Sequence, residues 1–486
     1  EVGFHHQRDF GQDVARGDHD GLPVGRRRFQ GLHGDRAAGA KAHPQLLAEF
    51  GGLYEGPQAA YVTKVGQKIA MQSGLANTQS AFTVSLLNSS VSNAFAIPGG
   101  YVYVTRQLLA LMNDEAELAS VMGHEVGHVA ARHAQQRNKA ATKGTLGMIL
   151  GTVLGAVVAG SDGAKLGQQL AGSLAQRYVL KYSRSQEYQA DDLGVSYLGK
   201  AGYDPMASST MLASLAAQTS LDAQLQGKGD KSLPEWASTH PDPASRVARA
   251  AERARLTAST GSARNREAFL AAVDGVMYDD DPHQGVIEGR TFRHPDLKLA
   301  FDAPAGFAMV NSPQAVVVSS SNGQAQFASA AYDGNLDHYV DAVFKSVGGQ
   351  TVLNYGSVTA RQVNGIKAAY ASAGANTQSG PVVVTVYAYE FAPNQAYHIV
   401  AITPSGSEGV FNSLFESVRR ISDAEAGGIR PKKVNVVTVK AGDTVSSLAA
   451  RMAYTDFKVE RFRVLNALGS GAALKVGQKV KIIIPG

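Results

Sequence analysis

The sequence has no cysteine, one tryptophan and few long uncharged apolar segments among its 486 residues. The absence of cysteine excludes disulfide bonds, thiolate zinc sites, a cysteine nucleophile and a lipid-bearing N-terminal cysteine. Any bound metal ion must therefore be held by histidine and carboxylate side chains. Hydrophobic residues make up 44% and charged residues 18% of the chain, a composition that excludes general disorder. A chain of this length can hold about three domains.

The main uncharged apolar segment is residues 144–160, which contain glycines at a spacing of four residues. Its 17 residues are marginal for a membrane span, and a crossing here would separate the candidate site residues described below. We expect a buried helix or a lid over the site. A peripheral membrane contact is the alternative for this segment.

The two ends of the chain differ from its middle. Residues 1–38 have scattered charges and no hydrophobic period, which predicts a disordered or non-native segment. No apolar core typical of a signal peptide is present there. From Lys432 to the end, ten Lys or Arg residues stand against three Asp or Glu residues, which favours an anionic partner or a solvated basic surface.

A metal-binding pattern lies in a segment that is expected to form a helix from about Asp114 onward. His124 and His128 are four residues apart, so their imidazoles lie on one helical face and can reach one metal ion. Glu125 follows the first histidine and can act as general base toward water at the metal. Two strand-like segments precede this helix, which is the context that such a pattern requires.

A catalytic zinc site of this kind needs a third protein ligand. Glu187 is the best candidate, on a helix expected over residues 183–200. Asp191 lies one turn later on the same face and could orient a liganding histidine.

A later His-Arg pair adds to the pattern. His240 could stabilise the oxyanion of a tetrahedral intermediate or occupy the fourth zinc position, and both options stay open. Arg246, just inside a helix that begins at Pro243, could hold the substrate or the intermediate.

These motifs, in this order along residues 40–255, resemble the gluzincin metallopeptidases of the HtpX, BepA and Oma type. The resemblance implies that His124, His128 and Glu187 bind one zinc ion per chain, with Glu125 as the general base. It also implies an edge strand beside the cleft for binding extended polypeptide, and the implied substrate-binding residues are Asn93, Ala94, Phe95, Ala96, Gly99, Gly100 and Tyr101.

The expected fold class is α+β, in several parts. A mainly helical zincin-type metallopeptidase domain with a small sheet covers residues 39–256, and a linker covers 257–289. Alternating runs over 290–423, with helices at 336–347 and 408–421, predict an antiparallel α+β domain of unknown role. A second linker at 424–434 leads to the last module.

Residues 435–486 show a strand, two helices and a strand, and resemble a LysM module. The resemblance implies binding of N-acetylglucosamine-containing glycan, with Gly442, Asp443, Thr444 and Asn466 as candidate glycan-binding residues. Peptidoglycan is the expected partner, and a nucleic-acid partner is not expected.

The sequence thus predicts a zinc metalloendopeptidase for protein quality control in a bacterial cell envelope, in the periplasm after export. Its expected substrates are unfolded or misassembled proteins. The alternative from another functional class is a cell-wall-binding chaperone or adaptor with a latent metal site.

Overall fold

The computed structural model describes residues 24–76, 79–134, 136, 182–225, 240, 242–349, 351–377 and 380–486. The segment 144–160, with its predicted lid or membrane contact, lies outside these residues. Within the described part of the chain, no helix is long and apolar enough to span a membrane.

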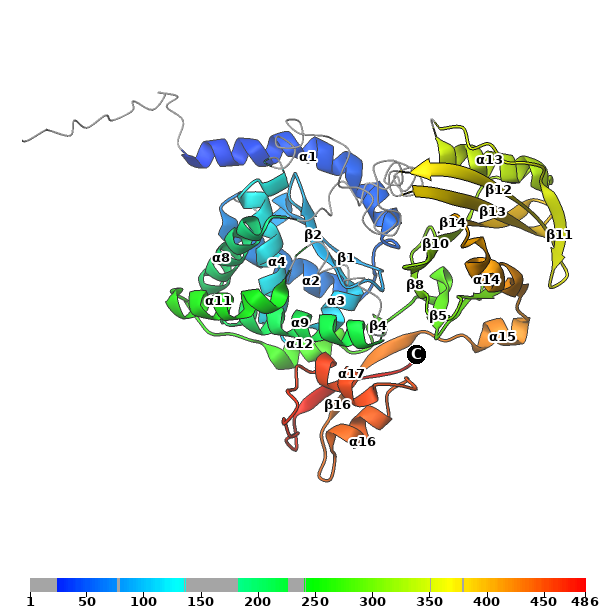
Figure 1. Ribbon diagram of the computed structural model, residues 1–486. Coiled ribbons are helices and arrows are strands. Elements are labelled where there is room, and N and C mark those ends of the chain that lie inside the picture. Colours follow the sequence, from blue (N-terminus) through cyan, green and yellow to red (C-terminus); the bar gives the residue numbers. More distant parts are fainter. Residues whose placement is uncertain are drawn as a thin grey trace, which may run out of the picture.

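The first domain is mainly helical and packs around a central helix, α4 (Figure 1). Helices α2 and α8 contact α4 directly, α9 packs on both α4 and α11, and α12 closes the same core. The helices are α2 (Pro57–Ala70), η1 (Met71–Ser73), η2 (Gln79–Ala81), α3 (Arg106–Leu111), α4 (Glu115–Ala130), α8 (Arg184–Lys200), α9 (Ala207–Leu225), α11 (Pro243–Leu256) and α12 (Arg266–Val273).

A small sheet lies beside α4 in the order β1-β3-β2. Its strands are β1 (Thr83–Leu87), β2 (Ala94–Ile97) and β3 (Tyr101–Thr105). β3 is central and pairs in parallel with β1 and antiparallel with β2. The turn at Pro98–Gly100 therefore joins β2 to β3, with Gly99 and Gly100 at positive φ, which glycine adopts without strain.

Helix α1 (Val24–Glu49) covers one face of this sheet. Leu46 of this helix and Phe50, the residue after its end, pack against Phe95 and Tyr103. The prediction of disorder over residues 1–38 is therefore wrong for 24–38, which are helical, and residues 1–23 lie outside the described part. The sequence did not predict the first part of this helix, because apolar positions recur at helical spacing only beyond residue 40.

The second domain consists of three layers, and helix α13 lies along its large sheet in Figure 1. The large sheet has seven strands. This sheet has the order β11-β12-β13-β14-β10-β9-β8 and is antiparallel throughout. Helix α13 packs on one face, and the other faces a four-stranded sheet of order β15-β7-β6-β5.

The elements of this domain confirm the antiparallel α+β prediction. They are η3 (Pro282–Gln284), β5 (Val286–Glu288), β6 (Thr291–His294), β7 (Leu299–Asp302), β8 (Ala308–Asn311), β9 (Val316–Ser320), β10 (Gly323–Ser329), α13 (Leu336–Gly348), β11 (Thr359–Val363), β12 (Ile366–Thr377), β13 (Gly380–Ala392), β14 (Gln395–Pro404), η4 (Glu408–Phe411), α14 (Asn412–Ser417) and β15 (Arg419–Arg420). The predicted helix over 408–421 ends early, because Arg419 and Arg420 pair with β7 instead.

The C-terminal module has the predicted strand-helix-helix-strand order: β16 (Lys432–Thr438), α16 (Val445–Ala450), α17 (Lys458–Leu465) and β17 (Lys479–Pro485). It lies against the first domain in Figure 1, and both share one hydrophobic core.

Both predicted linkers are wrong in part, because the structure builds them into domains. Helix α12 and strand β4 (Met277–Tyr278) lie within 257–289, and β4 pairs with β16 as the third strand of the module's sheet. Phe269 and Leu270 of α12 are fully buried. Within 424–434, α15 (Asp423–Gly428) continues from the second domain and β16 already begins at Lys432. The polar composition of 257–289 hid these elements because only a few of its residues face the core.

Candidate metal centre

Helix α4 carries the first half of the centre. Asp114 caps its N-terminus, with Oδ1 accepting a hydrogen bond from the Glu117 backbone N–H at 2.9 Å. The helix runs through the core, so His124, Glu125 and His128 are all buried. The spacing of four residues places both histidine rings on one face, with their Nε2 atoms 3.0 Å apart.

Helix α8 carries the second half. Ser183 forms a capping box with Gln186, which fixes where the helix starts. Glu187 and Asp191 then lie one turn apart on the face toward α4, and both are buried.

Glycines allow the two helices to cross closely. A Cβ atom on Gly127 would lie 3.0 Å from the Ala190 carbonyl oxygen, and one on Gly194 would lie 3.1 Å from the His124 nitrogen. Larger side chains here would push the helices apart. The close crossing therefore brings the α8 carboxylates within reach of the α4 histidines.

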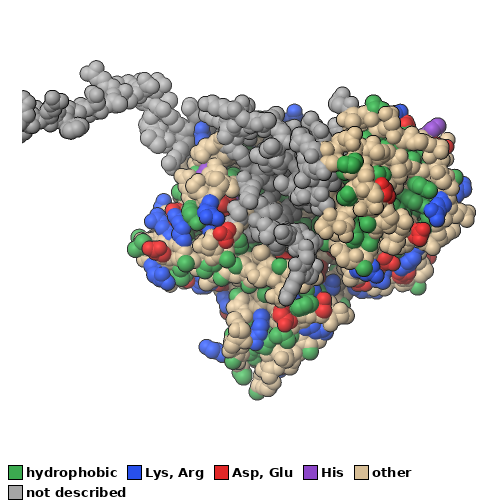
Figure 2. All heavy atoms as spheres, in the orientation of Figure 1, with side chains coloured by type: hydrophobic (Ala, Val, Ile, Leu, Met, Phe, Trp, Pro, Cys, Tyr) green, Lys and Arg blue, Asp and Glu red, His purple; other side chains and the backbone are tan. Residues whose placement is uncertain are grey.

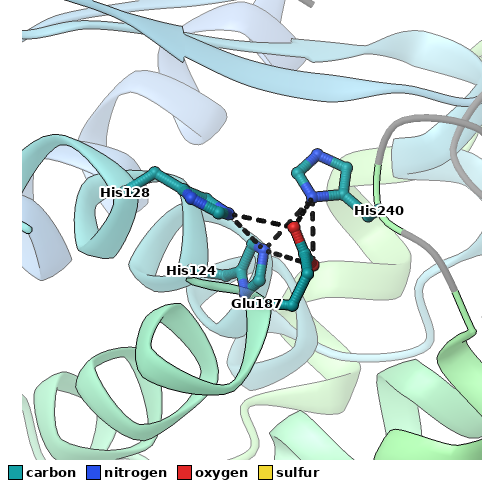
Figure 3. A group of neighbouring side chains, drawn as sticks. All are labelled: His124, His128, Glu187 and His240. Atoms are coloured by element: carbon teal, nitrogen blue, oxygen red, sulfur yellow. Dashed lines mark hydrogen bonds and ion pairs between the residues drawn. The ribbon is translucent and has the colours of Figure 1, made fainter. Parts of the chain in front are cut away.

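Four side chains converge at this crossing: His124, His128, Glu187 and His240 (Figure 3). Their ligand atoms all lie within 4.8 Å of one another. The Nε2 atoms of His124 and His128 are each 3.5 Å from a Glu187 oxygen. His240 Nδ1 lies 3.2 Å from Glu187 Oε1 and 3.3 Å from His124 Nε2.

These separations fit a tetrahedral zinc ion. Zinc–ligand bonds of about 2.0–2.1 Å hold the donors about 3.4 Å apart. A second observation agrees, because buried Glu125 Oε1 accepts no hydrogen bond from any described residue, although His240 Nε2 is 3.5 Å away. A metal-activated water would supply the donor that this oxygen lacks.

Asp191 and Arg246 hold the centre from behind. Asp191 Oδ1 is 2.9 Å from His124 Nδ1, so it orients the ring with Nε2 toward the other donors. Arg246 donates from Nε and Nη2 to the two Asp191 oxygens, at 2.8 and 2.6 Å, and its Nη1 is 2.7 Å from Glu187 Oε2. The sequence predicted that Arg246 holds the substrate or the intermediate, whereas the structure places it buried against the carboxylates of Glu187 and Asp191.

The charges set the protonation of the donors. Burial lowers the pKa of His124, but Asp191 and Glu187 outweigh it and raise that pKa to about 9. Burial and the neighbouring His124 hold the pKa of His128 well below its usual value. Burial would raise the pKa of Glu187, but His240 and His124 bring it far below its usual range. These directions favour an ionised Glu187, and a metal ion bound through His124 Nε2 would compete with a proton on that imidazole.

Of the predicted substrate segment, β2 is one of the two outer strands of its sheet in the described part of the chain, whereas β3 is the central strand. Strand β2 packs against α4, and its Phe95 ring stacks on Tyr103 beneath α1. The Thr105 N–H donates to the Asn93 carbonyl, and in an antiparallel pair the hydrogen-bonding residues alternate, so residues 93, 95 and 97 direct their backbone groups toward β3. Ala94 and Ala96 therefore direct their backbone groups to the opposite edge. Of the remaining predicted residues, Gly99 and Gly100 lie in the following turn, and Tyr101 begins the central strand β3.

The candidate glycan-binding residues fall in two different environments. Gly442 and Thr444 are exposed in the turn before α16, where Thr444 caps that helix and Asp443 Oδ2 accepts from the Lys440 N–H. Asn466 is buried, and its amide bonds the Phe462 carbonyl and both backbone groups of Lys481. The turn is thus a surface feature, and Asn466 ties α17 to β17.

Sequence reasoning missed two residues beside the centre. His133 Nδ1 lies 2.8 Å from His128 Nδ1, and the Tyr182 ring stacks on His128 with centroids 3.8 Å apart. His133 is five residues beyond His128, a spacing that helical periodicity does not place on the same face. Tyr182 precedes α8 and has no sequence signal.

Two family models match the chain. The model for peptidase family M48 matches residues 57–254, and the model for the LysM domain matches residues 437–482. The first contains all four converging side chains. The chain therefore combines a peptidase M48 domain with a C-terminal LysM domain, as the sequence resemblance predicted.

Similar proteins match part of the chain. A "Beta-barrel assembly-enhancing protease" of Escherichia coli O157:H7 is 34% identical over 200 residues, 40% of this chain and 38% of the relative. One of Yersinia pestis is 30% identical over 216 residues, 43% of this chain and 42% of the relative. The "Mitochondrial metalloendopeptidase OMA1" of Schizosaccharomyces pombe is 28% identical over 46% of this chain and 62% of its own length. The chain thus spans about two fifths of the bacterial relatives it matches.

Proposed function

We propose that this protein is a zinc-dependent endopeptidase that hydrolyses misfolded or unassembled envelope proteins and is tethered to peptidoglycan through its LysM domain. The observation that carries the proposal is the buried convergence of His124, His128 and Glu187 beside Glu125. The M48 domain supports peptide hydrolysis. The LysM domain and the name of the bacterial relatives support a role in a bacterial cell envelope, in the periplasm.

The residues divide the work of hydrolysis. His124, His128 and Glu187 would hold zinc, which supplies a Lewis acid when bound. Glu125 would take a proton from the attacking water and return it to the leaving amine. Burial raises the pKa of Glu125, which suits a carboxylate that carries a proton transiently near neutral pH. Asp191 and Arg246 would keep the ligands in place.

Strand β2 would bind the substrate. One face of β2 packs against α1 and the other against α4, so the substrate can bind only to the main-chain groups along its outer edge. An extended polypeptide could pair with the backbone groups of Ala94 and Ala96. Such pairing selects chain segments that are not already in a folded sheet, which suits misfolded or unassembled substrates.

The test of the activity is Glu125→Gln. We expect zinc-loaded protein to cleave an unfolded substrate such as casein, and the variant to lose activity by at least about 100-fold because the base is lost. Zinc content and melting temperature should stay unchanged, which separates loss of the base from loss of the site. Equal digestion by the two proteins would refute the proposal.

The alternative is a cell-wall-binding chaperone or adaptor whose metal site is latent. Its support is His240, which lies among the ligand atoms at 3.2–3.3 Å from Glu187 and His124, where it could close the fourth position. His240→Ala separates the cases. Faster cleavage indicates a closing ligand, slower cleavage indicates an oxyanion donor, and no cleavage by either protein favours the chaperone.

The tether is tested separately with the full chain. We expect it to sediment with purified peptidoglycan and to be released by N-acetylglucosamine oligosaccharides. Figure 2 shows that lysine and arginine side chains on the LysM domain, at the bottom of the view, are interspersed with acidic and apolar ones. We therefore expect N-acetylglucosamine oligosaccharides to release the protein more effectively than added salt does. Release by salt but not by the oligosaccharides would show that the protein binds peptidoglycan through charge alone and not through sugar recognition.

A further inference from the structure

His133 is the partner of His128 at the metal centre. It is fully buried, with Nδ1 2.8 Å from His128 Nδ1 and Nε2 2.9 Å from Gln189 Oε1. Gln189 lies on α8, so His133 connects the end of α4 to the helix that supplies Glu187.

The chain needs a special turn to place His133 there. Helix α4 ends at Ala130, and Arg132 follows with a φ of 53°, in the left-handed region. A residue other than glycine adopts this conformation at a cost of about 1 kcal/mol or more. The turn folds the chain back, so that a residue outside the helical periodicity meets His128 from the side away from Glu187.

The hydrogen bonds fix where the protons lie. If Nε2 of His128 is a metal ligand, it carries no proton, and the ring proton sits on Nδ1. His128 Nδ1 must then donate and His133 Nδ1 must accept. The proton of His133 therefore sits on Nε2, where the Gln189 oxygen accepts it. In this series of hydrogen bonds from His128 through His133 to Gln189, each donor meets an acceptor.

We infer that His133 is a positioning residue that fixes the tautomer and ring orientation of His128, as Asp191 does for His124. The two ligand histidines thus have different supports, a carboxylate for one and a neutral imidazole for the other. The inference rests on the metal site of the proposed function and deepens it. An imidazole partner adds no second negative charge beside Glu187, which already faces two histidines and Arg246.

The test is zinc affinity, measured by competition with a chelator, in wild type, His133→Phe and His133→Asn. The phenylalanine keeps the ring volume but cannot accept the hydrogen bond from His128, so we expect about 10- to 100-fold weaker zinc binding. Asparagine places its amide oxygen close to the position of Nδ1, so we expect it to recover most of the affinity. The matched control is Arg132→Gly, which keeps the turn at an exposed position and should bind zinc like wild type.

A second measurement separates positioning from packing. The ¹⁵N shifts of the zinc-bound protein should show His128 with its proton on Nδ1 and His133 with its proton on Nε2. Zinc affinity of His133→Phe within threefold of wild type, or the opposite tautomer at His133, would overturn the inference. A wild type that binds no zinc would overturn the proposed function instead. If His133→Phe does not fold, the tautomers in the wild type decide.

Discussion

Arg246 in the metal centre and Lys481 in the LysM domain are both buried cations, 2% and 0% exposed, with opposite surroundings. Arg246 faces the carboxylates of Glu187 and Asp191, which raise its pKa against the effect of burial. Lys481 Nζ donates to the carbonyls of Ala110 and Met112, at 2.6 Å each, and burial lowers its pKa to about 7.

The buried charge of Arg246 is compensated by carboxylates and positions them, whereas the buried charge of Lys481 has carbonyl partners instead and is costly to the fold. At the metal centre, paired charges converge on one point and hold ligands in place. At the junction, one lysine meets the carbonyls at the end of α3 and joins the LysM domain to the peptidase domain. Strand β4 and the shared core join the same two domains, so the LysM domain is not a loosely attached module.

The largest expected effect is that of Arg246→Met. It leaves two buried carboxylates without their cation, so we expect the free energy of unfolding of the metal-free protein to fall by about 3–5 kcal/mol. Zinc should restore part of this loss because it would compensate Glu187. Denaturant unfolding with and without zinc measures both effects.

The control for Arg246→Met is Arg249→Met on the same helix. Arg249 pairs with Asp192 at 2.7 Å, but both are about one-third exposed. Its loss should therefore cost about 1 kcal/mol or less. Equal losses at the two positions would mean that the buried charge has no special role.

A smaller effect is expected from Gly127→Ala, which changes the helix crossing but no charge. The new Cβ would meet Ala190 and push α8 away from α4, with a loss of about 1–3 kcal/mol in stability. Zinc affinity should fall as well, because Glu187 moves with α8. Melting temperature and chelator competition measure the two losses.

Gly427 provides the comparison for Gly127→Ala. It lies in helix α15, and no atom lies within 4 Å of a Cβ built there. Gly427→Ala should leave zinc affinity unchanged and stabilise slightly, since alanine favours helix. A Gly127→Ala variant that also keeps full zinc affinity would show that the close crossing is not what positions Glu187.

The last effect is gradual and smallest per step: a pH dependence at Lys481, measured per pH unit. Its pKa is 10.5 when unfolded and about 7 when folded, so between these values the unfolded state binds more protons. This group therefore adds stability as the pH rises above 7, and the buried charge costs most below 7. Relative to Lys481→Met, the unfolding free energy of wild type should rise from pH 7 to 9, with a slope that starts at about half of the limiting value and approaches about 1.4 kcal/mol per pH unit.

The contributions of the other titrating groups cancel in the difference between the unfolding free energies of wild type and Lys481→Met, so this difference is the quantity to measure. Denaturant unfolding of both proteins at several pH values gives it directly. A difference that stays flat across this range would mean that Lys481 remains charged, held by its two carbonyl partners and Glu117 as Arg246 is held by its carboxylates.

The sequence alone determined the parts that depend on neighbours along the chain. The spacing of His124 and His128, and of Glu187 and Asp191, predicts a shared helical face because a helix repeats every 3.6 residues. The caps at Asp114 and Ser183 are similarly local. The M48 and LysM resemblances rested on such ordered local motifs, and the family matches confirm them.

The tertiary structure decided everything that depends on which surfaces meet. The close crossing at Gly127 and Gly194, the turn at Arg132 that places His133, and the burial of Asn466 join residues far apart in sequence or outside helical periodicity. The pairing of β4 with β16 likewise turned a predicted linker into part of the LysM sheet. Contacts of this kind follow from the packing of whole faces, which local periodicity along one chain does not specify.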